Sequence, residues 1–169
     1  MGARPATTED LPRLGELCRL AHAELADLRG GWIWSRREAR PDPIEASLAG
    51  ALTAADHCVV VGTVEGYVAG YAVVRLEALR DGSLLGVLED FYTEPPFRAV
   101  GVGEAMMDEV VTFCRERGCV GVDSFALPGD RETKNFFESF GLKARGLLVH
   151  RSFLPPSPDP AEAPDPARG

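Results

Sequence analysis

Two glycines, Gly101 and Gly103, stand where a predicted strand is followed by a predicted helix, shortly after the basic residue Arg98. Glycine lets the backbone approach a ligand closely. The first amides of a helix have no partners within it, and the helix dipole adds partial positive charge there. Such a helix start suits an anion such as a pyrophosphate, to which Arg98 can add a charge-assisted hydrogen bond. On spacing alone, a tight strand-to-helix turn explains the two glycines equally well.

Two other nucleotide-binding patterns do not fit this segment. The dinucleotide fingerprint needs a third glycine where the chain has Met106. A Walker motif needs Gly-Lys-Ser/Thr, which does not follow Gly103. A dinucleotide-binding protein of that kind would also carry its glycine loop after the first strand. These patterns are therefore excluded as the basis of the predicted anion site.

The elements that would position this segment follow from periodicity and turn residues. Apolar residues at helical spacing predict a helix that begins after Thr7 or Thr8 and ends at Gly30. Three β-rich runs joined by short turns indicate an antiparallel meander. The predicted strands are 58–64, 67–77, 84–93, 119–125 and 147–153, and the later predicted helices are 44–54, 101–118 and 131–140. This pattern predicts an α+β domain with a mostly antiparallel sheet.

Length and composition restrict the class of protein. The 169 residues fit one domain, expected over 1–153, and the proline- and acid-rich stretch 154–169 is expected to be a disordered tail. A net charge of −8 argues against nucleic-acid binding. No apolar run is long enough to span a membrane, and the N-terminus lacks the apolar region of a secretory signal.

The cysteines and histidines do not point to a metal site. The four cysteines form no Cys-x-x-Cys pair, so no metal is expected, and they are interpreted as reduced core residues of a cytoplasmic protein. His22, His57 and His150 show no pairing that indicates catalysis and are interpreted as surface or strand-edge residues.

The segment from Leu88 to Gly103 resembles the acyl-CoA motif of the GNAT superfamily of N-acyltransferases. In that motif a hydrophobic strand leads to an acidic residue, a proline, an aromatic residue and then Arg/Gln-x-x-Gly-x-Gly/Ala. The run Glu89-Asp90-Phe91 looks most like the diamine acetyltransferases. A second block, 130–142, resembles the closing block of the family, and the likeness covers about 7–153, although the N-terminal third matches only in its helix pattern. The matching motif positions are Glu94, Pro95, Phe97, Arg98, Gly101 and Gly103.

The resemblance implies a GNAT fold, with flanking helices and a mixed sheet whose fourth and fifth strands, here 84–93 and 119–125, splay apart. It implies that the pantetheine arm of acetyl-CoA lies in the splay and that the pyrophosphate lies on the amides from 98 to 103. The implied activity is transfer of an acetyl group from acetyl-CoA to a primary amine of a small molecule or peptide. The implied cofactor-binding residues are Phe91, Tyr92, Thr93, Arg98, Ala99, Val100, Gly101, Val102, Gly103, Asp130 and Phe137.

Glu89 is the candidate general base of this reaction. An alkylamine is mostly protonated at neutral pH, since its pKa is about 10.4 if it resembles lysine. A carboxylate in a partly dry cleft can remove that proton directly or through a water. A solvated or ion-paired strand residue is the alternative interpretation. Asp90 is adjacent on the strand and is expected on the other face unless a bulge intervenes, where it would position a cationic substrate or be structural.

Two residues depart from the family pattern. Phe137 stands where the family has the tyrosine that protonates the leaving thiolate, and phenylalanine has no hydroxyl. Asp130 stands at the place of an asparagine, and an ionised aspartate cannot donate a hydrogen bond. An acyl-CoA-binding regulatory module with little or no catalysis is therefore the alternative function.

The acceptor is expected near a loop between the first two helices. Trp32, Trp34 and Arg36 lie there, and they could provide a flat wall and a contact for an acid. The alternative is an exposed loop anchored by tryptophan packing. Homodimers are common in the family, but no residue of the chain specifies one.

Overall fold

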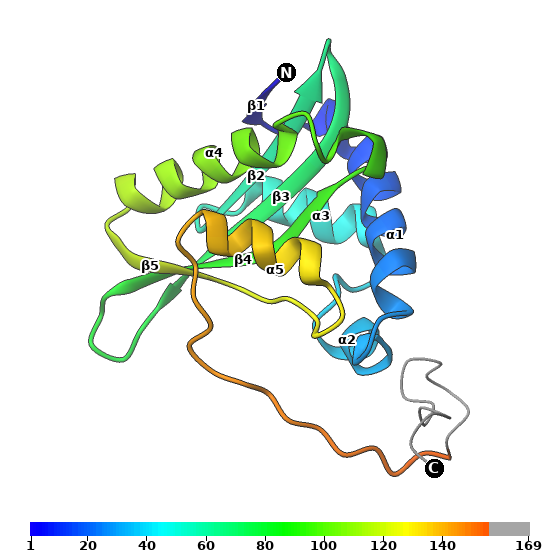
Figure 1. The fold of residues 1–169 in the computed structure, drawn as a ribbon. Coiled ribbons are helices and arrows are strands. Elements are labelled where there is room, and N and C mark those ends of the chain that lie inside the picture. The colour runs from blue at the N-terminus through cyan, green and yellow to red at the C-terminus, as the bar shows by residue number, and fades with distance from the viewer. Residues whose placement is uncertain (156–169) are drawn as a thin grey trace. The chain divides into compact units, whose positions relative to one another are not determined.

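The computed structural model describes residues 1–155, which form two compact units. The first unit comprises residues 1–21 and 40–125 and contains a five-stranded sheet in the order β1-β2-β3-β4-β5, whose strands are labelled in Figure 1. Neighbouring strands are antiparallel except for β4 and β5, which are parallel. The predicted α+β class with a mostly antiparallel sheet is confirmed. The strands are β1 Gly2–Pro5, β2 His57–Val64, β3 Tyr67–Ala78, β4 Leu84–Thr93 and β5 Cys119–Ser124.

Helices cover both faces of this sheet. The first turns of α1 (Leu11–Ala26) and all of α3 (Ile44–Thr53) pack on the face that carries Val61, Tyr71 and Val73. The other face packs against α4 (Val102–Glu116), and a Cβ added to Gly62 would lie 2.5 Å from Val102 Cγ1. Side chains alternate between these two faces along each strand.

An irregularity interrupts β4 at its centre. Val73 of β3 is the partner of Asp90, and the next residue, Val74, is the partner of Leu88. Glu89 is therefore the extra residue of a β-bulge, in which two residues of one strand oppose one of the other. The bulge changes which residues of β4 share a face before and after Glu89.

The pairing of β4 with β5 covers only the first half of β4. It runs from Leu84 opposite Cys119 to Leu88 opposite Ser124, where β5 ends. β4 continues beside β3 to Thr93. The pairing of the two strands therefore ends at Leu88, and β4 extends past the end of β5.

Two short elements around α1 and β4 fix the ends of these strands. The 3-10 turn Thr8–Asp10 precedes α1, and the amide of Thr7 donates to Asp10 Oδ2 at 2.8 Å. Arg4 binds the same carboxylate through two nitrogens at 2.7 and 2.9 Å. A second 3-10 turn, Pro95–Phe97, follows β4 and leads to α4. None of the described helices is long and apolar enough to cross a membrane.

The second unit comprises residues 22–39 and those from 126 onward and contains α2 (Gly31–Arg37) and α5 (Arg131–Ser139). The segment 32–37 is helical, and the expectation of a loop there was wrong. The strand expected at 147–153 is also wrong: this segment is irregular, and Leu147 and Val149 are about nine-tenths exposed. A strand needs a neighbouring edge to satisfy its backbone, and a run of apolar residues alone does not provide one. Most of the expected tail, 156–169, lies outside the described residues.

Candidate functional site

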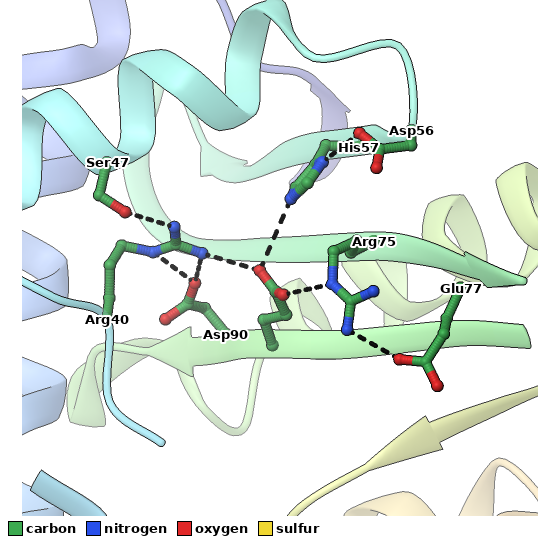
Figure 2. A network of polar contacts seen from close by, with 8 residues as sticks. Arg40, Ser47, Asp56, His57, Arg75, Glu77 and Asp90 are labelled. Atoms are coloured by element: carbon green, nitrogen blue, oxygen red, sulfur yellow. Dashed lines mark hydrogen bonds and ion pairs between the residues drawn. The ribbon is translucent and has the colours of Figure 1, made fainter. Parts of the chain in front are cut away.

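The carboxylates of Glu89 and Asp90 lie on the same side of the sheet. The bulge at Glu89 breaks the alternation that would otherwise separate two adjacent residues. Both carboxylates contact the guanidinium of Arg40, which comes from the segment before α3 (Figure 2). The β-bulge therefore allows Glu89 and Asp90 to share one site.

Asp90 and Arg40 form the buried part of this cluster. Arg40 Nε donates to Asp90 Oδ2 at 2.7 Å, and Nη2 donates to the same oxygen. The two side chains are 10% and 6% exposed, so this pair is largely removed from water. The hydroxyl of Tyr71 lies 3.4 Å from Asp90 Oδ1, and Arg40 Nη1 donates to Ser47 Oγ at 3.0 Å. Asp90 is thus held by partners of its own.

Glu89 is the more accessible carboxylate, with 30% of its side chain exposed. Its Oε1 accepts from Arg75 Nε at 2.8 Å. Its Oε2 lies 3.4 Å from Arg40 Nη2 and 3.8 Å from His57 Nε2. The carboxylate therefore lies between two guanidinium groups and one imidazole, and it can still be reached by solvent.

The surrounding charges and burial determine the protonation states of the arginines and the tyrosine in this cluster. Burial alone would lower the pKa of Arg40, but the Asp90 carboxylate outweighs it and raises that pKa. The hydrogen bond to Glu89 raises the pKa of Arg75. Burial, together with the negative charge of Asp90, raises the pKa of Tyr71 well above its usual value, so its hydroxyl stays a donor. The arginines remain cations, and Tyr71 remains neutral.

The glycines of the predicted anion site begin α4. Gly101 is the N-cap residue with φ +86°, a conformation that favours glycine, and its carbonyl accepts from the amide of Ala105 at 3.1 Å. Gly103 is buried in the first turn, while Ala99 and Val100 are exposed before it. The first amides of α4, those of Val102 and Gly103 among them, have no acceptor one turn earlier within the helix. The chain thus has at this point the helix start that an anion requires.

Arg98 and Glu94 hold the connection between β4 and α4. Arg98 Nε donates to the carbonyl of Thr93 at 2.9 Å, and the guanidinium carbon lies 5.6 Å from the centre of the Tyr92 ring. Glu94 accepts from Arg13 of α1 at 2.6 Å and from the hydroxyl of Tyr67 at 3.1 Å. Two charged residues of the motif therefore have structural contacts that fix the end of β4 next to the start of α4.

Thr93 bears on whether these residues fit acetyl-CoA. Among the described residues, its Oγ1 is the buried side-chain oxygen without a hydrogen-bond partner. It ends the part of β4, with Phe91 and Tyr92, that continues after β5 has ended. A polar atom of this kind, next to a strand end and a helix start, fits a ligand with amide and phosphate groups.

The remaining predicted residues belong to the second unit. On α2, Arg36 lies over the ring of Trp32 at 4.2 Å, and Trp34 meets His22 edge-on at 5.5 Å. On α5, the side chain of Asp130 accepts from the amide of Thr133 at 3.0 Å and so caps the helix, a role that suits an acceptor. Phe137 is buried, 7% exposed.

Arg40, Arg75 and His57 are the contact residues that sequence reasoning missed. The Arg40–Asp90 contact joins residues 50 positions apart, and no spacing pattern in the sequence reveals it. His57 was interpreted as a strand-edge residue without a partner relevant to catalysis, yet it faces Glu89. The one available signal is that Arg75 lies within a predicted strand and that His57 directly precedes another.

Solved structures similar to this chain support the fold. The tetramutant of the BH1408 protein from Bacillus halodurans matches with a TM-score of 0.77 and 17% identity, over 90% of this chain and 99% of that one. An aminoglycoside acetyltransferase from an uncultured soil metagenomic sample, solved with sisomicin, matches with a TM-score of 0.65 and 20% identity, over 90% and 94%. Glucosamine-6-phosphate N-acetyltransferase from Arabidopsis thaliana matches with a TM-score of 0.64 and 21% identity, over 89% and 97%.

Sequence comparison identifies the family. No curated protein sequence matches the chain. The family model described as the acetyltransferase (GNAT) family matches residues 20–142, which is most of the chain and includes β4, the start of α4 and α5. The chain belongs to the acetyltransferase (GNAT) family.

Proposed function

We propose that this chain transfers an acetyl group from acetyl-CoA to a primary amine of a small molecule or peptide. The observation that carries the proposal is that β4 continues to Thr93 after β5 has ended opposite Leu88, and that the glycine-started helix α4 follows it through the turn Pro95–Phe97. A strand that continues past its neighbour can bond an extended amide chain, and a helix start can bind phosphate. Acetyl-CoA contains both groups: its pantetheine arm is the extended amide chain, and its pyrophosphate is the phosphate that the helix start would bind.

The residues that would hold acetyl-CoA divide by chemistry. The backbone of Phe91, Tyr92 and Thr93 would bond the pantetheine amides, and the segment from Arg98 to Gly103 would bind the pyrophosphate. Asp130 and Phe137 are carried over from the family motif alone. When bound, acetyl-CoA supplies an acetyl group activated as a thioester.

Glu89 is proposed to remove the proton from the acceptor amine. Its Oε2 is the oxygen that faces His57, while Oε1 is bound by Arg75. Proton removal by a positioned base is typically worth about 10²–10⁴-fold in rate. The solvent-accessible side chain of Glu89 can meet both a bound amine and water.

The acceptor is better described as an amine in general than as a polyamine. The diamine acetyltransferase likeness rested on the acidic pair, but Arg40 and Arg75 already neutralise Glu89 and Asp90. The pair therefore offers no surplus negative charge for a second ammonium group. We propose that Asp90 acts on the substrate only through Arg40, and that Trp32, Trp34 and Arg36 line the acceptor side.

Phe137 favours one alternative function. Without a tyrosine hydroxyl on α5, the leaving thiolate must take its proton elsewhere, and a module that binds acyl-CoA without turnover is the competing reading. We propose a cytoplasmic location and a domain spanning 1–153 on the grounds given by the sequence, and a homodimer only because homodimers are common in the family.

Thiol release from acetyl-CoA against a panel of primary amines, with cofactor binding measured by calorimetry, tests the proposal. Binding with turnover supports it, binding without turnover favours the module, and no binding removes both. Glu89→Gln should lower kcat by about 10²-fold or more while leaving cofactor affinity unchanged. Glu77→Gln is the matched control, because Glu77 also binds Arg75, at 3.0 Å, but does not contact Arg40.

A further inference from the structure

His57, the first residue of β2, lies beside the carboxylate of Glu89. Its Nε2 is 3.8 Å from Glu89 Oε2, and its side chain is 17% exposed. The sheet register explains this position: His57 is opposite Arg75, and Arg75 binds Glu89 from the same face. Figure 2 shows His57 directed toward this cluster from the strand beyond Arg75.

Asp56 fixes the form of the imidazole. Its Oδ1 lies 2.7 Å from His57 Nδ1, and the hydrogen bond to His57 lowers the pKa of the Asp56 carboxyl. An ionised carboxylate only accepts hydrogen bonds, so Nδ1 must carry the proton of the neutral ring. The unprotonated Nε2 therefore faces Glu89. Because the Asp56 side chain is 59% exposed, this end of the pair reaches solvent.

Glu89 forms ion pairs with the guanidinium groups of Arg40 and Arg75, and a proton on its carboxylate would weaken both. An imidazole is ordinarily the stronger base, with a pKa of about 6.5 against about 4.3 for a glutamic acid. His57, the second proton acceptor of the cluster, is therefore the group that can hold the proton before it passes to solvent.

We propose that His57 is the relay residue through which the proton taken by Glu89 leaves the site, a role that rests on the proposed acetyl transfer. The amine N–H bond breaks as Glu89 Oε2 gains the proton. The O–H bond then breaks as His57 Nε2 gains it, directly after a small side-chain shift or through one water. The imidazolium, paired with Asp56, passes the proton to bulk water or buffer, and Glu89 returns as a carboxylate.

The charges around His57 define its pH behaviour. Asp56 precedes it, Arg75 faces it from β3, Glu89 faces it from β4, and Arg40 reaches Glu89 from the segment before α3. A protonated imidazole cannot accept a second proton at Nε2. Turnover should therefore fall toward acidic pH, and this acidic limb should be absent from a variant without the imidazole.

Two measurements on the full chain test the relay. First, ring-nitrogen NMR should compare the His57 signals of the wild type and of Glu89→Gln. Replacing the carboxylate beside Nε2 should change the chemical shift of that nitrogen, while the signals of exposed His150 stay unchanged. An unchanged His57 Nε2 signal would overturn the contact on which the relay depends, whatever the activity.

Second, kcat should be recorded against pH with the amine that gives the fastest thiol release. His57→Gln should lower kcat by about tenfold or more and remove the acidic limb, and imidazole in the buffer should restore rate to His57→Ala. His150→Gln is the control and should match the wild type. Wild-type turnover with an unaltered pH profile in His57→Gln would sink the relay and leave acetyl transfer standing, whereas a wild-type chain that releases no thiol would sink both.

Discussion

Arg40 and Asp90 bind each other on the sheet face under α3, with Arg40 Nε 2.7 Å from Asp90 Oδ2 and both side chains nearly excluded from water. Removing one partner leaves the other as an unpaired buried charge. Arg40→Met should therefore lower the free energy of unfolding by about 3–5 kcal/mol, measured by urea denaturation.

A double variant distinguishes the effect of one unpaired charge from the effect of losing both side chains. Arg40→Met with Asp90→Asn removes both charges and should recover part of the lost stability, because the uncompensated charge is gone. Arg37→Met, which alters an arginine whose side chain is 67% exposed, should change stability by less than about 1 kcal/mol. Equal losses in Arg40→Met and Arg37→Met would mean that the buried pair does not stabilise the fold.

Gly101 combines a positive φ with the candidate phosphate site. Alanine at φ +86° should cost about 1–2 kcal/mol of stability, and the altered helix start should weaken acetyl-CoA binding in calorimetry. Gly118, at the other end of α4, has φ +72° and open space around it, so Gly118→Ala should cause similar strain without affecting the cofactor. Equal cofactor affinity in the two variants would argue against a phosphate site at Gly101.

Gly62 sets the distance between β2 and α4. A Cβ there would lie 2.5 Å from Val102 Cγ1 and 2.9 Å from Met106 Cγ, so Gly62→Ala should cost about 1–3 kcal/mol by overpacking. Gly50, inside α3, has nothing within 4 Å of its added Cβ. Gly50→Ala should instead be neutral or stabilise by up to about 1 kcal/mol, since alanine is the better helix former. Thermal unfolding of both variants checks the contrast.

Asp10 gives stability a defined pH dependence. Its hydrogen bond from Arg4 lowers the pKa of the buried Asp10 carboxyl. A lowered folded-state pKa gives stability that is fully present above the unfolded value, about 3.9, and is lost as pH falls through the folded value.

The matching variant is Asp10→Asn, which should be less stable than the wild type by about 1–3 kcal/mol near neutral pH in urea denaturation. The difference should shrink as pH falls below about 4. Glu9→Gln, an exposed neighbour, is the control and should follow the wild type at each pH. A difference that stays constant into acid would show that the Asp10 charge is not the cause.

Local signals predicted the central strands well. The bounds 84–93 agree with β4, and 67 and 58 fall within one residue of the starts of β3 and β2, because turn residues and β-branched runs are local properties. β1 was missed because Gly2–Pro5 has no strand pattern and becomes a strand only by pairing with β2. The strand expected at 147–153 did not form although its residues favour a strand, because a sequence pattern alone does not supply a neighbouring strand for pairing.

The sequence predicted only those parts of the candidate site whose residues are close together in the chain. The run from Glu89 to Gly103 carries both the base candidate and the helix start. The bulge and the contacts of Arg40 and His57 depend on residues from β2, β3 and the segment before α3, which meet only after folding. Pairings of this kind leave no trace in the spacing of a single sequence.

The bulge has a consequence for how the site could be gained or lost. Because Leu88 and Asp90 are opposite adjacent residues of β3, a chain lacking Glu89 would restore regular pairing while every other side chain of β4 kept its face. The proposed base is thus a one-residue insertion in a strand that is complete without it. Deletion of this one residue would therefore remove the carboxylate and leave the pairing partners of Leu88 and Asp90 on β3 unchanged.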